Sequence, residues 1–178
     1  MKQKHNHSAW QVNPILAGRL KPWLIDKGSL TLRLQKNYPI FRVKSLRVND
    51  AKPIIGEAFM LNLPIYKTAL IREVLLLGNQ QPVVFAHSVL PRASLRGAWQ
   101  GLGKLGNQPL GAALFANPRV KRAPLSYKKL MPHQVLYQKA TQHLSTKPAY
   151  LWARRSVFSL NCANILVTEV FLPQLLSS

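Results

Sequence analysis

Two long apolar segments joined by a short polar connection constrain the fold of this chain more than any other feature of its sequence. The first segment, ALIREVLLL, begins at Ala69, and the polar stretch GNQQP separates it from the second, VVFAHSVLP. The connection contains Gly78 and Pro82, which are typical of a turn between strands. The pattern therefore predicts an antiparallel β-hairpin over residues 69–91.

The remaining segments alternate between hairpin-like and helical patterns. The last 25 residues contain RRSVFSL, the polar turn NCAN and ILVTEVFLP, which predict a second hairpin. After Gly28, the segment SLTLRLQKNYPIFRVKSLRV alternates apolar and polar residues, which predicts strands with a turn near residues 37–39. The spacing of apolar residues predicts helices over residues 12–25 and 93–105, and a third helix in PLGAALFA after Pro109.

The order of these elements predicts an α+β fold. Hairpins separated by helices, without regular βαβ alternation, favour an antiparallel sheet covered by helices on one face, with a ligand pocket buried between sheet and helices. A chain of 178 residues, 47% of them apolar, suits a single domain over residues 1–178. We expect residues 1–10 to be a flexible basic N-terminus. Residues 117–150 are basic and interrupted by prolines, and we expect a connector with a helical turn or two.

The charge balance is strongly positive, because 25 Lys and Arg face only five acids, giving a formal net charge of +20. Such a field attracts nucleic acid, an acidic membrane surface or a small polycarboxylate, and does not choose among them. Any carboxylate chemistry must come from the five acids, which are Asp26, Asp50, Glu57, Glu73 and Glu169. Their scatter disfavours a catalytic carboxylate pair or an acidic metal cage.

Several classes of protein lose support from absent motifs. The single cysteine, Cys162, excludes an intrachain disulfide and a cysteine-based metal centre. No apolar run approaches the roughly 18 residues of a membrane-spanning helix, and no clean secretory signal is present, so we expect a cytoplasmic protein. The sequence has no P-loop, Rossmann glycine pattern, HExxH or nucleophile elbow, which disfavours nucleotide, zinc-protease and esterase functions.

Two charged residues interrupt apolar strands. Both alternating faces of residues 165–172 are apolar, so Glu169 is costly there unless it is protonated, paired or facing a polar cavity. The alternative is a glutamate at the sheet rim or in an internal salt bridge. Arg72 shares its strand face with apolar residues, and it could hold a planar carboxylate by two parallel hydrogen bonds. Alternatively, Arg72 or its neighbour Glu73 lies at the strand's entry or pairs across strands.

Two weaker candidates depend on local structure. Leu110 follows Pro109 at the expected start of a helix, where free backbone N–H groups favour an anion, although every helix has such an end. His87 lies within VVFAHSVLP. A histidine there is more often a satisfied core or rim residue than a catalyst.

Together, these segments resemble the chorismate pyruvate-lyase family, also called 4-hydroxybenzoate synthases. The resemblance rests on the order and spacing of LIREVLLL, VVFAHSVLP, KLGNQPLGAALF, LWARRSVFSL and LVTEVFLP, and covers most of residues 28–173. It implies a cofactor-free and metal-free lyase that converts chorismate into 4-hydroxybenzoate and pyruvate, the first step of ubiquinone biosynthesis. We expect a monomer.

The resemblance further implies roles for particular residues. The ring carboxylate would lie on Arg72 and on backbone at Leu110, the ring hydroxyl would meet Glu169, and Leu30 would line the pocket. His87 stands where the family has an arginine, so an anion contact is replaced there by a histidine. Arg155 in LWARRSVFSL is a further candidate.

Two other functions remain open at this stage. Effector-binding domains of some bacterial transcription regulators are similar in fold to this family, but the sequence offers no room for a helix-turn-helix before Leu30. A nucleic-acid-binding protein would explain the positive charge, and residues 121–147 could contact phosphate. We do not expect nucleic acid to be the partner, because no strand or helix shows a clear pattern of aromatic and basic residues.

Overall fold

The computed structural model describes residues 9–176, so most of the predicted N-terminal segment lies outside the described residues. The strands of the described part are β1 (Phe41–Ala51), β2 (Ala69–Gly78), β3 (Gln81–Leu90), β4 (Lys121–Arg122), β5 (Ser126–Leu130), β6 (Leu151–Leu160) and β7 (Ala163–Phe171). The α-helices are α1 (Lys21–Leu24), α2 (Leu30–Asn37), α3 (Ile55–Met60), α4 (Arg92–Arg96), α5 (Leu110–Ala116) and α6 (Val135–Thr141). The 3₁₀ helices are η1 (Gly18–Leu20), η2 (Leu102–Lys104) and η3 (Pro173–Leu176).

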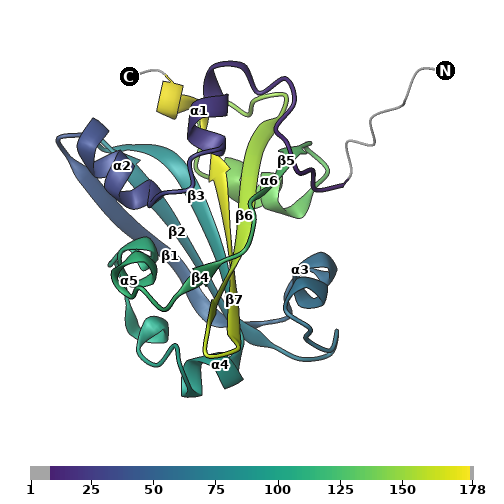
Figure 1. Ribbon diagram of the computed structural model, residues 1–178. Coiled ribbons are helices and arrows are strands. Elements are labelled where there is room, and N and C mark those ends of the chain that lie inside the picture. Colours follow the sequence, from purple (N-terminus) through teal and green to yellow (C-terminus); the bar gives the residue numbers. More distant parts are fainter. Residues whose placement is uncertain (1–8, 177–178) are drawn as a thin grey trace.

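The strands form one antiparallel sheet in the order β1-β2-β3-β7-β6-β4, and β5 also pairs with β6 (Figure 1). The pairing of β3 with β7 joins the two predicted hairpins at the centre of the sheet. None of the helices in the described part is long and apolar enough to cross a membrane. The predicted α+β fold with an antiparallel sheet is confirmed.

Both predicted hairpins are present, and both turns have two residues. Asn79 and Gln80 connect β2 to β3, and Asn161 and Cys162 connect β6 to β7. All four residues have positive φ, between 48° and 68°. Two consecutive left-handed residues match the right-handed twist of paired strands, which explains the tight connections.

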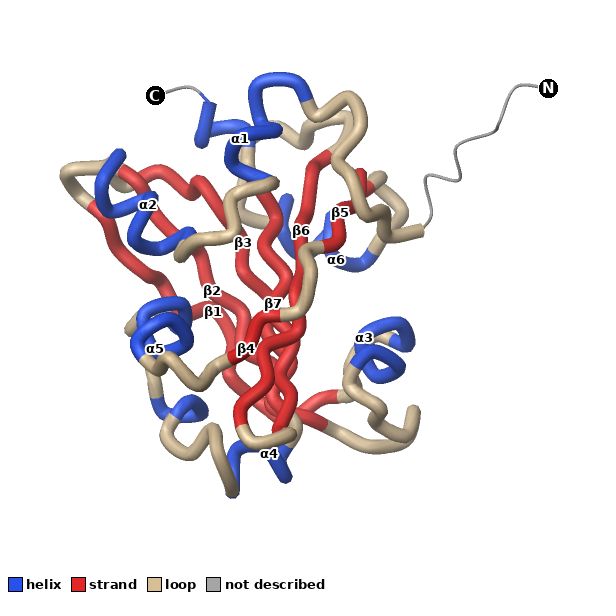
Figure 2. The backbone as a smooth tube through the Cα atoms, viewed as in Figure 1, coloured by secondary structure: helices blue, strands red, loops and turns tan. Residues whose placement is uncertain are grey.

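Helices pack on both faces of the sheet, so the expectation of a single covered face was wrong (Figure 2). On one face, Leu30 and Leu34 of α2 pack with Val74 and Val84. On the opposite face, the buried residues of α6 pack with apolar residues of the central strands, namely Leu75, Phe85, Ala153 and Val170. Central strands with apolar residues on both sides bury both faces, which requires helices on each.

The predicted strand after Gly28 is a helix, α2, over Leu30–Asn37. Ser29 caps it, because its hydroxyl accepts a hydrogen bond from the backbone N–H of Leu32. Leu30 and Leu34 lie one helical turn apart and are both buried, whereas Leu32 is 52% exposed. The apparent period of two was therefore a helical repeat whose middle leucine faces outward.

Two further expectations require correction. The helix predicted over residues 93–105 is split into α4 and η2, because Gly97 ends α4 with a φ of −112° and a ψ of −123°, and Gly101 before η2 has a φ of 95°. The predicted connector contributes β4 and β5 to the sheet as well as the helix α6. The turn at Gly78 also has a steric requirement, since a Cβ there would lie 2.5 Å from the ring of Tyr38.

Candidate active site

A cavity lies between one face of the sheet and the helices α2 and α5. Polar groups from Thr31, Ser88 and three charged residues, Arg72, Arg122 and Glu169, are set in a largely apolar wall. Its volume is about 40 Å³, well below the roughly 150 Å³ of a cavity that admits benzene. An aromatic ring can therefore enter only when lining side chains move apart.

The register of four strands brings the site residues onto one face. Because side chains alternate across a strand, Arg72 and Val74 of β2 face the cavity while Glu73 faces the other side. The pairing of Arg72 with Ser88 and of Ala86 with Glu169 carries the same face across β3 to β7. Ala86 of the first hairpin and Glu169 of the second, which both line the cavity, are therefore paired neighbours in the sheet.

Arg72 is a buried cation, only 2% exposed. Its Nη2 donates hydrogen bonds to the carbonyls of Gly106 at 3.0 Å and Gln108 at 2.7 Å, while its buried Nε has no partner. Within residues 9–176 no carboxylate lies in ion-pair range of Arg72. Burial lowers the pKa of Arg72, which expresses the cost of keeping this charge unpaired. The guanidinium is suited to accept an anionic ligand.

The start of α5 lies beside this cation. Pro109 is the N-cap residue and Leu110 begins the helix, so the N–H groups of Leu110 and Gly111 have no carbonyl within the helix to bond. Arg72 donates a hydrogen bond to the carbonyl of Gln108, which lies two residues before Leu110. Both Leu110 and Gly111 line the cavity. A Cβ on Gly111 would lie 3.0 Å from Oγ1 of Thr31, so glycine permits the close approach of α5 to α2.

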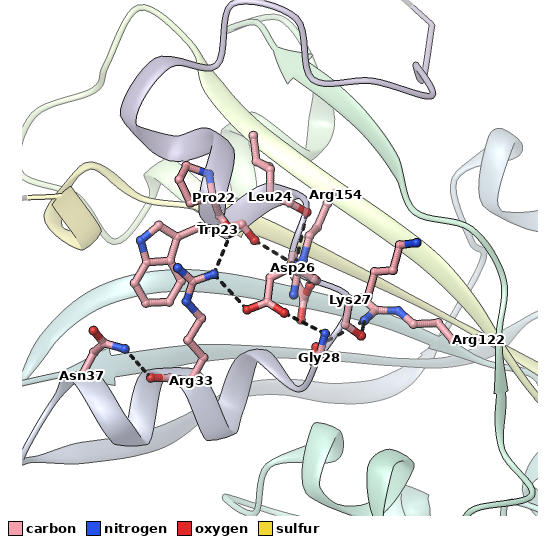
Figure 3. A network of polar contacts seen from close by, with 11 residues as sticks. Pro22, Trp23, Leu24, Asp26, Lys27, Gly28, Arg33, Asn37, Arg122 and Arg154 are labelled. Atoms are coloured by element: carbon pink, nitrogen blue, oxygen red, sulfur yellow. Dashed lines mark hydrogen bonds and ion pairs between the residues drawn. The ribbon is translucent and has the colours of Figure 1, made fainter.

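Glu169 is held by Arg154, a residue that the sequence reasoning missed. Arg154 is 1% exposed, and its Nε donates to Oε2 of Glu169 at 2.5 Å. Its Nη1 donates to the carbonyls of Trp23, Leu24 and Asp26, which fixes the guanidinium (Figure 3). The NCAN turn contained the signal for this pair, because a two-residue connection at 161–162 places residue 154 opposite residue 169.

Arg122 is a second missed cation, because it lies in the segment read as a connector. Its Nη1 donates to the carbonyls of Lys27 and Gly28, and Figure 3 shows it reaching the loop before α2. Its guanidinium lies 5.0 Å from the ring centroid of Phe158. Burial lowers the pKa of Arg122, and no carboxylate of the described chain pairs with it. The cavity therefore contains two cations without internal counter-ions.

Comparisons with known proteins identify the family of this chain. The family model described as chorismate lyase matches residues 5–178. The chain belongs to the chorismate lyase family. It is 49% identical to a probable chorismate pyruvate-lyase of Nitrosomonas europaea over 93% of each chain. It is 44% identical to a protein of the same description from Methylobacillus flagellatus, over 94% of each chain.

Solved structures with the same fold come from a different class of protein. The effector domain of PhnF from Mycobacterium smegmatis superimposes with a TM-score of 0.56 and 13% identity, covering 83% of this chain and 90% of that chain. The ligand-binding domain of a putative GntR-family transcriptional regulator from Bordetella bronchiseptica gives a TM-score of 0.53 and 16% identity, covering 75% and 83%. At these identities the likeness shows the fold alone. It confirms the antiparallel sheet with helices, a fold that this chain shares with these two domains.

The structure places the predicted residues of this chorismate lyase family member in two groups. Leu30, Arg72, Leu110 and Glu169 all line the cavity. His87 and Arg155 do not, because each follows a cavity-facing position by one residue in its strand and points to the opposite face. The anion contact that we expected from His87 is therefore absent from this cavity.

On the opposite face, His87 belongs to a buried charged cluster. Its Nδ1 lies 2.9 Å from Glu73, its Nε2 lies 3.2 Å from Glu57 of α3, and Lys139 of α6 lies 2.8 Å from Glu73. Burial alone would lower the pKa of His87, but hydrogen bonds to both glutamates outweigh burial and raise it to about 9. Burial would likewise raise the pKa of Glu73, yet hydrogen bonds from His87 and Lys139 lower it to about 2. The cluster is an internal ion-pair network that joins α3 and α6 to the sheet.

Proposed function

We propose that this protein is a chorismate pyruvate-lyase, which eliminates pyruvate from chorismate to give 4-hydroxybenzoate, the aromatic precursor of ubiquinone. The observation that carries the proposal is the unpaired, buried guanidinium of Arg72 in an apolar cavity. A site of this kind favours a planar carboxylate with an apolar ring. Family membership identifies the ring as that of chorismate.

Arg72 and the start of α5 bind the ring carboxylate in this proposal. The guanidinium offers its unpaired Nε–H, and the N–H groups of Leu110 and Gly111 offer further donors. A carboxylate placed there supplies the counter-charge that Arg72 lacks, and it does so away from water, where electrostatic attraction is strongest. Leu30 contributes apolar wall beside the ring.

Arg122 binds the second carboxylate, which chorismate carries on its enolpyruvyl group. The substrate is a dianion and the product 4-hydroxybenzoate is a monoanion, so two unpaired cations match the substrate better than the product. This assignment predicts that Arg122 contributes to the binding of chorismate but not to the binding of 4-hydroxybenzoate. Arg122→Gln should weaken chorismate binding about tenfold or more while leaving 4-hydroxybenzoate binding nearly unchanged.

Glu169 meets the C4 hydroxyl of the ring, with its carboxylate oriented by Arg154. In the elimination, the C3–O bond to the enolpyruvyl group breaks and the hydrogen on C4 is lost, which makes the ring aromatic. The enolpyruvate that leaves gains a proton and becomes pyruvate, so the reaction balances without an oxidant or reductant. Aromatisation provides the driving force, and the protein's contribution is to align the breaking bond and stabilise charge on the leaving group.

Turnover of chorismate tests the proposal directly. Purified protein is incubated with chorismate, and 4-hydroxybenzoate and pyruvate are quantified by chromatography in equal amounts. The Arg72→Ala variant is assayed beside the wild type as the negative control, since it lacks the cation that the proposal requires. No product from a folded wild-type protein, or equal product from both proteins, contradicts the proposal.

We also propose that the enzyme is a monomer in the cytoplasm. An exposed free thiol at Cys162 fits a reducing compartment. Light scattering after size exclusion tests the assembly state, and cell fractionation tests the location.

A further inference from the structure

A second and larger cavity lies on the opposite face of the sheet, outside the proposed active site. Its volume is about 420 Å³, within the range of small-molecule pockets. It is formed between β5, β6, the start of α3, the start of α6 and the N-terminal segment at Trp10. The backbone of Gln11 pairs with Tyr127 of β5 through two hydrogen bonds, which fixes Trp10 at the rim.

Two cations line this cavity without an internal counter-ion. Among residues 9–176, the one hydrogen bond from the side chain of Arg155 in β6 goes to the hydroxyl of Ser126, and Lys128 of β5 lies diagonally across the strand pair. Both lie against the ring of Trp10, at 4.1 Å and 6.0 Å. No carboxylate of residues 9–176 forms an ion pair with either of them.

The one acid in the wall, Glu57, offsets the charge of Arg155 only in part and forms no ion pair with Arg155 or Lys128 among residues 9–176. Glu57 is already engaged by His87 and by the backbone N–H of Ile54. Burial outweighs the charge of Glu57 and lowers the pKa of Arg155 to about 10, and burial together with the charge of Arg155 lowers the pKa of Lys128. Two half-buried cations that repel each other are stabilised by an anion placed between them.

Apart from His133 and Gln134, the remaining wall is apolar, and it defines the rest of the ligand. Leu130, Leu136, Val135 and Ile54 surround the space below Trp10. A free inorganic anion would leave this apolar surface uncovered, whereas an apolar body attached to a carboxylate would bury it. Arginine suits a carboxylate because its fork can donate two parallel hydrogen bonds.

From this geometry we infer that the cavity is a second ligand site, which binds a monocarboxylate with a small apolar body such as an aromatic ring. Arg155 and Lys128 bind the carboxylate, and Trp10 with the leucines binds the ring. The site does not depend on the proposed lyase activity. Its residues lie on the face of the sheet away from Arg72 and Glu169.

Trp10 provides a local reporter for this site. The chain has four tryptophans, so the four indole N–H signals in a ¹⁵N correlation spectrum can be followed during a titration with sodium benzoate at constant ionic strength. The Trp10 signal is assigned with Trp10→Phe. We expect it to shift saturably with benzoate, and to respond at least about tenfold more weakly to the neutral analogue benzyl alcohol.

Substitutions separate this site from the one that contains Arg72. Lys128→Gln and Arg155→Gln should each weaken the Trp10 response about tenfold or more, while Lys36→Gln, an exposed lysine on α2, should leave it unchanged. The side chain of Lys128 makes no hydrogen bond within the described part of the chain, so its variant is informative even if Arg155→Gln is unstable. The inference is overturned by a Trp10 signal that ignores benzoate, that responds equally to benzyl alcohol, or that is unaffected by the Lys128 substitution. Chorismate turnover is measured separately, so failure of either proposal is recognised without the other.

Discussion

Replacing Arg72 by glutamine tests the proposed active site at a buried charge that lines its cavity. Glutamine keeps hydrogen-bond donors and much of the side chain's length but removes the cation. In the wild-type protein the guanidinium bonds the carbonyls of Gly106 and Gln108, and no carboxylate of residues 9–176 pairs with it. The substitution therefore removes a charge whose only counter-ion would be the ligand.

The magnitude follows from the burial of this contact. Truncating one partner of a buried, hydrogen-bonded charge pair costs about 2–5 kcal/mol, and about 1.4 kcal/mol corresponds to tenfold. Catalytic efficiency should fall by roughly a hundredfold or more. Stability should change far less, by about 1–2 kcal/mol, because loss of two hydrogen bonds to carbonyls is offset by removal of an unpaired buried charge.

The assay compares kcat/KM for chorismate with the unfolding midpoint in urea for the same protein samples. Arg92→Gln is the matched control, because Arg92 is an exposed arginine paired with Asp50 at the surface. The control should retain full activity. A folded Arg72→Gln protein with wild-type kcat/KM refutes the reasoning. If Arg72→Gln loses activity because it unfolds, Arg72→Lys, which retains the charge, distinguishes loss of the charge from loss of the fold.

Three further predictions concern other parts of the molecule. Glu169→Gln retains one acceptor for the ring hydroxyl but removes the charge that Arg154 holds, so it should lower kcat about tenfold or more with little change in KM, and wild-type kcat would exclude a catalytic role for the charge. Because folding raises the pKa of His87 from 6.5 to about 9, its protonation should stabilise the fold fully below pH 6.5 and cease to do so as the pH rises to 9. Urea unfolding should show a loss of about 1.4 kcal/mol per pH unit across this window, and equal slopes for wild type and His87→Gln would contradict the assignment. Gly78→Ala should destabilise the fold by about 1–3 kcal/mol, since the added methyl would overlap the buried ring of Tyr38; a melting temperature equal to that of the wild type would show that the ring can move.

The hairpins could be predicted from the sequence because their signals are local. Apolar residues on both alternating faces identify central strands, and polar pairs such as Asn79 and Gln80 identify the turns. The helix α2 could not be distinguished from a strand in the same way. In SLTLRL the leucines recur every two residues, and only the cap at Ser29 and the burial of Leu34 show which repeat the structure follows.

Whether a strand residue faces the active-site cavity depends on its odd or even position in the strand, and the sequence shows this only when the register of the strand is known. Arg72 and Glu169 were recognisable because each charge interrupts an apolar strand. In the pair Arg154 and Arg155, both residues are arginine, and the choice between them requires counting from the NCAN turn. The count places Arg154 on the face of Glu169 and Arg155 on the opposite face, beside Trp10.

The scarcity of acids has a structural consequence that connects the two cavities. All five side-chain carboxylates lie in the described part, and each forms an ion pair: Asp26 with Arg33, Asp50 with Arg92, Glu57 and Glu73 with His87, and Glu169 with Arg154. None of these ion pairs includes the cations that line the two cavities, which are Arg72, Arg122, Lys128 and Arg155. A buried charge without a counter-ion is costly, and fixed internal acids would compete with an anionic ligand for the same guanidinium groups. The fold therefore uses its few carboxylates to position helices and neighbouring arginines, and it leaves the cavity cations available to bind the carboxylates of ligands.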